Sequence, residues 1–588
     1  MARNRSLDVA SIGLQCLVFL AFFTSHCNAQ CDSVSRQQKD EFSWEKIVPT
    51  KDLIWRDCYS GHQCARLKVP LDYAHPDSDS RSAAIALRRI HSVVPHDSPE
   101  YRGPILINPG GPGGSGVDAM GGFAGNLPGI VGPQFDILGF DPRGIRRSTP
   151  RVSFFESRAE RAFWKPNVPI NMNASADAFA RHWAYAQLQG QLAGERDDGS
   201  LRFVNTDYTA RDMMKIVEAH GRSKLLYWGF SYGTTLGATF ASIFPDNVER
   251  LIIDGNVGPA YYENQWGDVL IDTETGWLSF IEGCVAAGPS GCAFYSPSPL
   301  EMKQKVDHLY ASIRARPAPV RTDAGYGLVD YAMLRTTMFF ALYSPYRTFP
   351  LLAQALADLD AGNGTAVFNM ASAGPLSSPP FHCECDPSQH RFESVDEAGI
   401  AVICNDGERF KTSYEDALKE HLNMSATSNW YELHPPLRIE CSTWPEYPKE
   451  NFKGPMGGNT SFPLLVIGNT ADPVCPLWAS HKMSDVFPGS VVLTQDSPGH
   501  CSVSAPSICT QKYVREYFIN GTLPPLGTVC PVIGSPFPPI NPGVDADSDS
   551  DAQMVFAGMS AVDRDIWDSV NELAMRTFVV PFKLGGMR

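Results

Sequence analysis

The stretch Leu225–Phe240 has the sequence LLYWGFSYGTTLGATF and places Ser231 between Gly229 and Gly233. The apolar residues before the serine predict a short buried strand, and the residues after it predict the start of a helix. A serine at so abrupt a strand-to-helix turn has its hydroxyl held in the open, and a side chain on either glycine would collide with the neighbouring strand or helix. The pattern therefore predicts a G-x-S-x-G nucleophile elbow with Ser231 as the nucleophile.

The elbow serine requires a base and an acid, because a serine hydroxyl is a weak nucleophile at neutral pH. Elbow hydrolases present these groups in the chain order serine, acid, histidine. His500 follows a predicted strand on a glycine-containing loop, whereas His481 lies within a predicted helix. Asp472 ends another predicted strand, while its rival Asp496 lies on the same loop as His500. We therefore predict a triad of Ser231, Asp472 and His500.

A second glycine-rich loop, NPGGPGGSG, spans residues 108–116 and follows the apolar segment PILI. The next predicted strand ends in Asp141, at about the place of a ribose-binding acid in a dinucleotide site. Pro112 removes an amide from the part of the loop that would hold phosphate, and no lysine follows to make a P-loop. Three glycines of the loop match G-x-G-x-x-G, namely Gly111, Gly113 and Gly116.

An oxyanion hole is the interpretation of this loop that also accounts for the elbow. In elbow hydrolases the glycine loop after an early strand supplies one backbone N–H, and the residue after the nucleophile supplies another. We therefore expect the N–H groups of Gly111 and Tyr232 to stabilise the oxyanion.

The order of elements predicts an α/β fold with a mostly parallel sheet flanked by helices. Strands alternate with helical segments over residues 44–258, and the pattern resumes over residues 456–533. Between them, residues 259–455 contain helical segments separated by Pro-, Ser- and Cys-rich loops, which predicts a largely helical cap inserted over the sheet. Residues 534–588 predict an acidic, proline-rich linker and a C-terminal tail.

The N-terminus predicts export. Arg3 and Arg5 precede an apolar run, and small residues end at Ala29, which is typical of a signal peptide over residues 1–29. No later run of apolar residues is long enough for a membrane span, so we expect a soluble secreted or vacuolar protein. Five N-x-S/T sites follow the signal and are predicted glycosylation sites: Asn173, Asn363, Asn423, Asn459 and Asn520.

The cysteines predict disulfides rather than metal ligands. The chain has 15 cysteines, of which Cys16 and Cys27 precede residue 30, so an odd number remains and at least one is unpaired. Cys58 and Cys64 can close a small loop, and a Cys475–Cys501 bond would join the loops of the predicted acid and base. No cysteine spacing resembles a zinc knuckle, and we expect neither metal nor cofactor.

Several motifs resemble the secreted tripeptidyl aminopeptidase-like branch of the alpha/beta-hydrolases, related to proline iminopeptidases. These are NPGGPGGSG, FDPRG, GFSYGTTLGA with FPDNVERLIIDG, GNTADPVCP and SPGHC, together with VPLDY and GTLPPLGTVC near the two ends of the match. The resemblance covers roughly residues 44–533 and places Ser231, Asp472 and His500 on the branch's triad. It implies a serine exopeptidase that releases short peptides from a free N-terminus beneath a cap domain.

The sequence differs from the usual pattern of this branch at two places, and these differences leave the substrate preference open. DPRG is followed here by Ile145-Arg146-Arg147-Ser148, where a small residue and G-x-S are usual, and Cys475 stands where threonine is common. A peptidase specific for a free N-terminus needs buried cap carboxylates to bind the substrate ammonium, and Glu263 and Glu282 are candidates by location.

Three rival functions share parts of this pattern. An esterase acting on small acyl groups has the same elbow and triad. A catalytically silent binding protein could use the same fold, although every predicted catalytic position is filled. A dinucleotide-dependent oxidoreductase is disfavoured by Pro112. The formal charge of −15 argues against nucleic acid as a partner, and the oligomeric state is not predicted.

Overall fold

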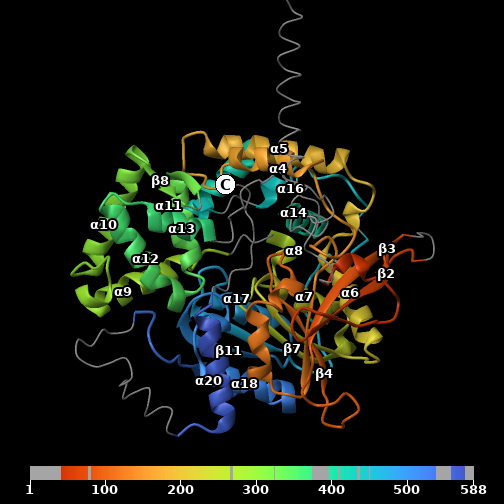
Figure 1. Ribbon diagram of the computed structural model, residues 1–588. Coiled ribbons are helices and arrows are strands. Elements are labelled where there is room, and N and C mark those ends of the chain that lie inside the picture. The colour runs from red at the N-terminus through yellow and green to blue at the C-terminus, as the bar shows by residue number, and fades with distance from the viewer. Residues whose placement is uncertain are drawn as a thin grey trace, which may run out of the picture.

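The computed structural model describes residues 42–76, 81–264, 269–323, 325–373, 396–407, 411–433, 437–448, 450–537 and 558–576. Within these ranges a ten-stranded sheet forms the core, and a helical layer lies beyond one end of its strands (Figure 1). The predicted signal peptide, residues 1–29, lies outside the described residues.

The sheet is mostly parallel, as the sequence predicts. Its strand order is β1-β2-β3-β5-β4-β6-β7-β10-β11-β12. Every neighbouring pair from β5 to β12 is parallel, while β1, β2 and β3 pair antiparallel at one edge. The strands are β1 Arg56–Cys58, β2 His62–Pro70, β3 Ser82–Ile90, β4 Gly103–Asn108, β5 Phe135–Phe140, β6 Leu225–Phe230, β7 Val248–Asp254, β10 Leu465–Ala471, β11 Val491–Pro498 and β12 Val529–Cys530.

Both faces of the sheet are covered by helices. Alternate residues of β4 belong to different apolar clusters, with Leu106 on one face and Ile105 and Ile107 on the other. Because both faces of these strands are buried, they are nearly continuously apolar. The helices of the core are α2 Gly116–Ala119, α3 Leu127–Val131, α6 Thr206–Ala219, α7 Tyr232–Ile243, α17 Leu477–Val486, α18 Ile508–Asn520 and α20 Ala561–Ala574.

The cap is largely helical and also contains a β-hairpin that the sequence interpretation did not include. Its helices are α4 Arg158–Trp164, α5 Ala178–Glu195, α8 Tyr261–Asn264, α9 Thr273–Gly291, α10 Pro299–Ala315, α11 Tyr331–Ala341, α12 Pro345–Asp360, α13 Thr365–Ala373, α14 Asp396–Asn405, α15 Tyr414–Thr427 and α16 Leu437–Cys441; the hairpin strands are β8 Ala318–Thr322 and β9 Gly325–Val329.

Short 3₁₀ helices join several of these elements. They are η1 Trp44–Lys46, η2 Phe123–Asn126, η3 Lys165–Asn167, η4 Leu201–Phe203, η5 Pro245–Asn247, η7 Tyr431–Leu433 and η8 Ser502–Ser504.

Helices α4 and α5 pack with the cap, although the predicted domain boundaries assign them to the first part of the core. Figure 1 shows both helices in the layer that holds α14 and α16. Gln187 donates to Ser442 Oγ at 2.6 Å, and Gln189 donates to Glu440 at 3.0 Å. Phe179 of α5 shares an apolar cluster with Ile439 of α16. The cap layer is therefore built from two separate segments of the chain.

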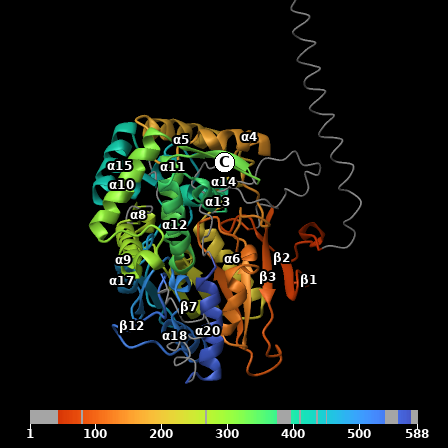
Figure 2. The same ribbon diagram turned by 60° about the vertical axis from the view of Figure 1, so that its left-hand side comes forward.

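Within the C-terminal tail, helix α20 docks on the core. Helix α20 buries Ile566, Val570 and Leu573 and lies beside α18 (Figure 2). Its Asp563 pairs with Lys512 of α18 at 2.9 Å. Among the described residues, no helix is both long enough and apolar enough to cross a membrane.

Four disulfides join described cysteines, and Cys58–Cys64 is the small loop that the spacing predicts. The other three are Cys284–Cys292, Cys404–Cys441 and Cys509–Cys530. The predicted Cys475–Cys501 bond is wrong, because the structure leaves both thiols unbonded. All five asparagines of the predicted glycosylation sites are exposed.

Candidate active site

Ser231 occupies the turn between β6 and α7 with φ 57° and ψ −125°. This is a strained conformation for a non-glycine residue, which is a feature of functional turns. A Cβ on Gly229 would lie 2.3 Å from the carbonyl oxygen of Gly233, and a Cβ on Gly233 would lie 2.7 Å from that of Asn108 on β4. Both glycines are therefore required by close packing around the serine, as the motif predicts.

Asp472 and His500 form a buried hydrogen-bonded pair at the carboxyl ends of β10 and β11. His500 Nδ1 lies 2.9 Å from Asp472 Oδ2 and 3.0 Å from Oδ1. Because a carboxylate only accepts, Nδ1 carries the proton and Nε2 presents a lone pair. The His500 backbone N–H donates to Tyr343 O at 3.0 Å, which fixes the loop that carries the imidazole.

Backbone amides hold the carboxylate of Asp472 in place. Its Oδ1 accepts from Val474 N and Cys475 N, each at 2.9 Å, and its Oδ2 accepts from Cys501 N at 3.0 Å. These donors stabilise the ionised carboxylate and fix its orientation toward the imidazole. The rival residues are placed differently, since His481 and Asp496 are both exposed.

The backbone carbonyl of Asp254 brings the serine and the histidine loop to one point. Ser231 N donates to this oxygen at 3.0 Å, and Cys501 Sγ, on the residue after His500, donates to it at 3.3 Å. A Cβ on the next residue, Gly255, would lie 3.4 Å from both His500 Cε1 and Asp472 Oδ2. The structure thus gathers the three predicted triad residues around the end of β7.

Asp254 is a buried carboxyl group behind the site that the sequence interpretation missed. It accepts hydrogen bonds from Ser502 N at 2.8 Å, Ser502 Oγ at 2.6 Å and Trp228 Nε1 at 3.3 Å. Burial raises the pKa of Asp254 to about 6. Its position at the end of strand VERLIID is the signal that could have drawn attention to it.

The glycine loop lies directly against the elbow. A Cβ on Gly110 would lie 2.8 Å from Ser231 Cβ and 3.1 Å from Tyr232 N. The N–H of Gly110 donates to Asn108 Oδ1 at 2.9 Å, so this amide is already occupied. In the described part of the chain, the amides of Gly111 and Tyr232 donate to no other group, which leaves them available as oxyanion donors.

The dinucleotide alternative finds no support in this loop. Asp141, the candidate ribose acid, is fully buried and accepts from Ser115 Oγ at 2.5 Å, Val117 N at 3.1 Å and Arg147 N at 3.2 Å. A Cβ on Gly116 would lie 2.2 Å from Phe140 O, so this glycine allows α2 to pack on β5. Both features of the motif therefore serve packing around the loop.

Two buried thiols flank the triad where a disulfide was expected. Cys475 lies three residues after Asp472, and the thiol of Cys501 donates to the Asp254 carbonyl oxygen at 3.3 Å. The thiol of Cys501 is thus hydrogen-bonded to a backbone carbonyl, and the structure leaves both thiols unbonded to each other. Burial and the neighbouring carboxylates raise the pKa of both thiols, so they remain protonated at neutral pH.

The cap covers this corner of the core. The Tyr343 ring, between α11 and α12, contacts the His500 ring at 5.0 Å between centroids. Helix α14 packs on the glycine loop, where a Cβ on Gly399 would lie 2.6 Å from Pro112 O. Ser231 is only 7% exposed and His500 only 2% exposed, so a substrate must reach the serine through the cap.

A hydrogen-bond network ties the cap to the elbow. Asp406, at the end of α14, accepts from Thr206 Oγ1 at 2.5 Å and from Tyr261 OH at 2.8 Å. The same Thr206 hydroxyl lies 2.5 Å from Tyr232 OH, and Tyr232 is the predicted oxyanion residue. No motif in the sequence marks Asp406, because its role depends on contacts 200 residues away.

The carboxylates predicted to bind a substrate ammonium are not buried. Glu263 and Glu282 are both exposed. Two buried cap glutamates are paired with arginines, Glu397 with Arg161 at 2.8 Å and Glu432 with Arg335 at 2.6 Å.

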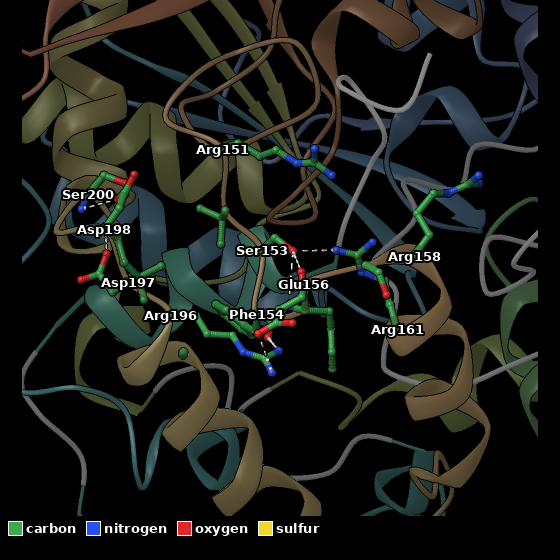
Figure 3. A pocket seen from close by; sticks show the side chains of 15 residues that line it. Arg151, Ser153, Phe154, Glu156, Arg158, Arg161, Arg196, Asp197, Asp198 and Ser200 are labelled. Carbon is green, nitrogen blue, oxygen red and sulfur yellow. Dashed lines mark hydrogen bonds and ion pairs between the residues drawn. The ribbon is translucent and has the colours of Figure 1, made fainter. Parts of the chain in front are cut away.

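A cavity of about 420 Å³ is lined by residues of α4, of α5 and of the loop that precedes α4, and not by the triad. Four arginines line it, together with Glu156, Asp197 and Asp198, and the guanidinium of Arg161 reaches Ser153 Oγ (Figure 3). Arg196 is held by Glu160 at 2.9 Å. None of the three predicted triad residues lines this cavity, so it is separate from the candidate active site.

Two family models match the chain. The model described as alpha/beta hydrolase fold matches residues 103–288, which include the elbow. The model described as TAP-like protein matches residues 432–530, which include Asp472 and His500. The chain is therefore a serine hydrolase with the alpha/beta-hydrolase fold. Within that class, residues 432–530 match the TAP-like model, in agreement with the motif resemblance.

Similar proteins include both peptidases and an esterase. The serine protease Hip1 of Mycobacterium tuberculosis is 29% identical over 486 residues, covering 80% of this chain and 87% of that protein. The tripeptidyl aminopeptidase of Streptomyces lividans is 26% identical over 506 residues, covering 82% and 87%. Carboxylesterase B of Mycobacterium tuberculosis is 26% identical over 480 residues, covering 80% and 86%.

Proposed function

We propose that this protein is a secreted serine exopeptidase that releases short peptides from the free N-terminus of peptide substrates. The observation that carries the proposal is the buried Asp472–His500 pair, gathered with the strained Ser231 beneath a cap. Two similar proteins named as a serine protease and a tripeptidyl aminopeptidase support peptides as the substrate class. Disulfides and exposed glycosylation sequons support export.

The reaction would begin with attack of Ser231 Oγ on the scissile carbonyl carbon. His500 Nε2 takes the hydroxyl proton, and the ionised Asp472 stabilises the imidazolium that forms. The N–H groups of Gly111 and Tyr232 donate to the oxyanion of the tetrahedral intermediate. His500 then returns the proton to the leaving amine, which gives an acyl-enzyme.

Water then hydrolyses the acyl-enzyme, again with His500 as the base. His500 Nε2 removes a proton from water, the hydroxide attacks the acyl carbon, and Ser231 Oγ leaves with the proton. The cap limits access to the acyl-enzyme, which would restrict the size of the peptide that is released.

An esterase acting on small acyl groups is the second candidate, because one of the similar proteins is named Carboxylesterase B. The elbow, triad and oxyanion loop serve both reactions equally, so only the substrate can separate them.

A substrate panel tests the proposal. Purified protein is incubated with free and N-acetylated tripeptide amides and with short-chain esters, and product masses are recorded. We expect intact tripeptides to be released from free substrates only. Faster ester cleavage with no peptide product would favour the esterase, and equal cleavage of free and acetylated peptides would exclude the exopeptidase.

A further inference from the structure

Two histidines and a buried aspartate meet at the end of the sheet opposite the triad. His91 follows β3, His96 lies on the loop to β4, and Asp136 is the second residue of β5. Because β3 runs antiparallel to β5, its carboxyl end lies beside the start of β5, where Ile90 pairs with Ile137. The parallel strands carry Ser231 at their other end, so this cluster is remote from the candidate active site.

The spacing of the three side chains fits a metal ion. His96 Nε2 lies 3.1 Å and His91 Nδ1 lies 3.6 Å from Asp136 Oδ1, and the three ligand atoms all lie within 4.8 Å of one another. Tetrahedral zinc with ligand bonds of about 2.0–2.2 Å separates its ligands by about 3.3–3.6 Å. Small rotations of the two exposed rings would bring both nitrogens to that spacing.

The hydrogen bond between His91 and Gln63 determines which ring nitrogen of His91 carries the proton. His91 Nε2 lies 2.7 Å from Gln63 Oε1, and the same oxygen accepts from Arg89 Nε at 3.2 Å and Arg89 Nη2 at 2.8 Å. This atom is therefore the amide oxygen, so His91 Nε2 donates to it. In the neutral ring, Nδ1 then directs a lone pair at the carboxylate of Asp136, and a metal ion bound between these two acceptors would stabilise the arrangement.

Other groups orient the aspartate from behind. Its Oδ1 accepts from Ser92 N at 2.7 Å, while Oδ2 accepts from Tyr101 OH at 3.0 Å and Arg89 Nη1 at 3.5 Å. Such outer hydrogen bonds are the usual support of a metal ligand. The Arg89 charge disfavours a second cation nearby, but it sits at Oδ2 and leaves Oδ1 toward the histidines.

The cluster is open to solvent on its histidine side. Asp136 is fully buried, whereas the side chains of His91 and His96 are 42% and 40% exposed. The His96 ring stacks between His91 and Tyr101, at 4.8 and 4.3 Å between centroids, which limits its movement. An ion can thus enter from water and keep a water molecule as its remaining ligand.

We propose that His91 Nδ1, His96 Nε2 and Asp136 Oδ1 bind one divalent transition-metal ion, with Zn²⁺ the best fit to two imidazoles and a carboxylate. The ion would fasten the loop of residues 91–102 to the start of β5 and stabilise this edge of the sheet. The sequence predicted no metal, because His91 and His96 lie 40 or more residues before Asp136 and match no ligand motif.

Zinc titration of the full-length protein tests the proposal. The chain is prepared without a histidine tag, treated with EDTA and dialysed, and ZnCl₂ is added in a calorimeter. We expect one ion per chain, with at least tenfold weaker binding in His91→Ala and His96→Ala. His481→Ala is the matched control, since this exposed histidine on α17 is remote from the cluster.

Thermal melting provides a second measurement that does not depend on catalysis. Zn²⁺ should raise the melting temperature of the wild type and of His481→Ala, whereas His91→Ala and His96→Ala should show no rise although they melt normally in EDTA. Mg²⁺ should have no effect, because it prefers oxygen ligands. Absence of zinc binding, or equal binding in all four proteins, would overturn the proposal.

Discussion

The buried Asp472 of the core is stabilised differently from the buried Glu432 and Glu397 of the cap. In the core, backbone amides hold the carboxylate of Asp472 in place. Its side-chain partner is His500 Nδ1, which leaves His500 Nε2 able to accept a proton. In the cap, Glu432 and Glu397 are neutralised by arginines. Asp472 therefore presents its charge to a reaction, while the two paired cap glutamates hold helices together. We therefore expect substitutions at the core site to affect turnover and substitutions at the paired cap glutamates to affect stability.

Replacing the nucleophile tests the core most directly. Ser231→Ala should lower kcat by about a million-fold, because the acyl-enzyme can no longer form. Turnover of a cleavable tripeptide amide measures the effect, and an unchanged melting temperature controls for folding. Near-normal turnover would end the assignment of Ser231.

Neutralising the acid should have the next largest effect. Asp472→Asn offers a side-chain amide to His500 and disfavours the tautomer that leaves Nε2 unprotonated, so kcat should fall by about 10⁴-fold. Asp496→Asn is the control, because this exposed aspartate is four residues from His500 on the chain and should leave kcat unchanged. Equal losses in the two variants would contradict the pairing seen in the structure.

Breaking the cap pair should affect stability rather than chemistry. Glu432→Gln leaves the buried Arg335 guanidinium without its counter-charge, which should cost about 3–5 kcal/mol in the free energy of unfolding. Denaturant unfolding measures the loss. Glu218→Gln, in the exposed pair with Lys215, should change stability by about 0.5 kcal/mol or less. A small effect at Glu432 would show that the cap does not depend on this pair.

The buried Asp254 predicts a pH dependence of stability in the core. Its folded pKa of about 6 lies above the ordinary 3.8, so the folded state holds the proton more tightly. Stability should fall as pH rises from about 4 to about 6 and then level off, by about 3 kcal/mol for this one group. In Asp254→Asn that slope should vanish, so the difference between wild type and variant should shrink with rising pH. A difference that is constant from pH 4 to 7 would exclude this role.

The smallest effect is expected at the exposed cap carboxylates. Glu263→Gln and Glu282→Gln should raise KM for free-amine peptides by at most a few-fold, since exposed charges interact weakly with a ligand. Steady-state kinetics on free and N-acetylated peptides measures it. A rise in KM of similar size for acetylated peptides would mean that neither residue binds the ammonium.

Much of the core could be predicted because its information is local. The apolar segment before Ser231 and the glycines around it specify a strand, a turn and a helix within a few residues. The position of Asp472 and His500 after late strands then follows from chain order. By contrast, the antiparallel β1, β2 and β3 were not predicted, because their pairing joins segments that carry no turn motif of this kind.

The sequence by itself determined the fold class, the elbow and the candidate triad, since glycine sterics and strand order restrict the backbone locally. Only the tertiary structure decided that Cys475 and Cys501 remain unbonded, that α4 and α5 join the cap, and that Asp254 and Tyr343 support the histidine loop. It also brought Asp136 to His91 and His96. These outcomes depend on how distant segments pack, and packing sets which way a buried side chain can point.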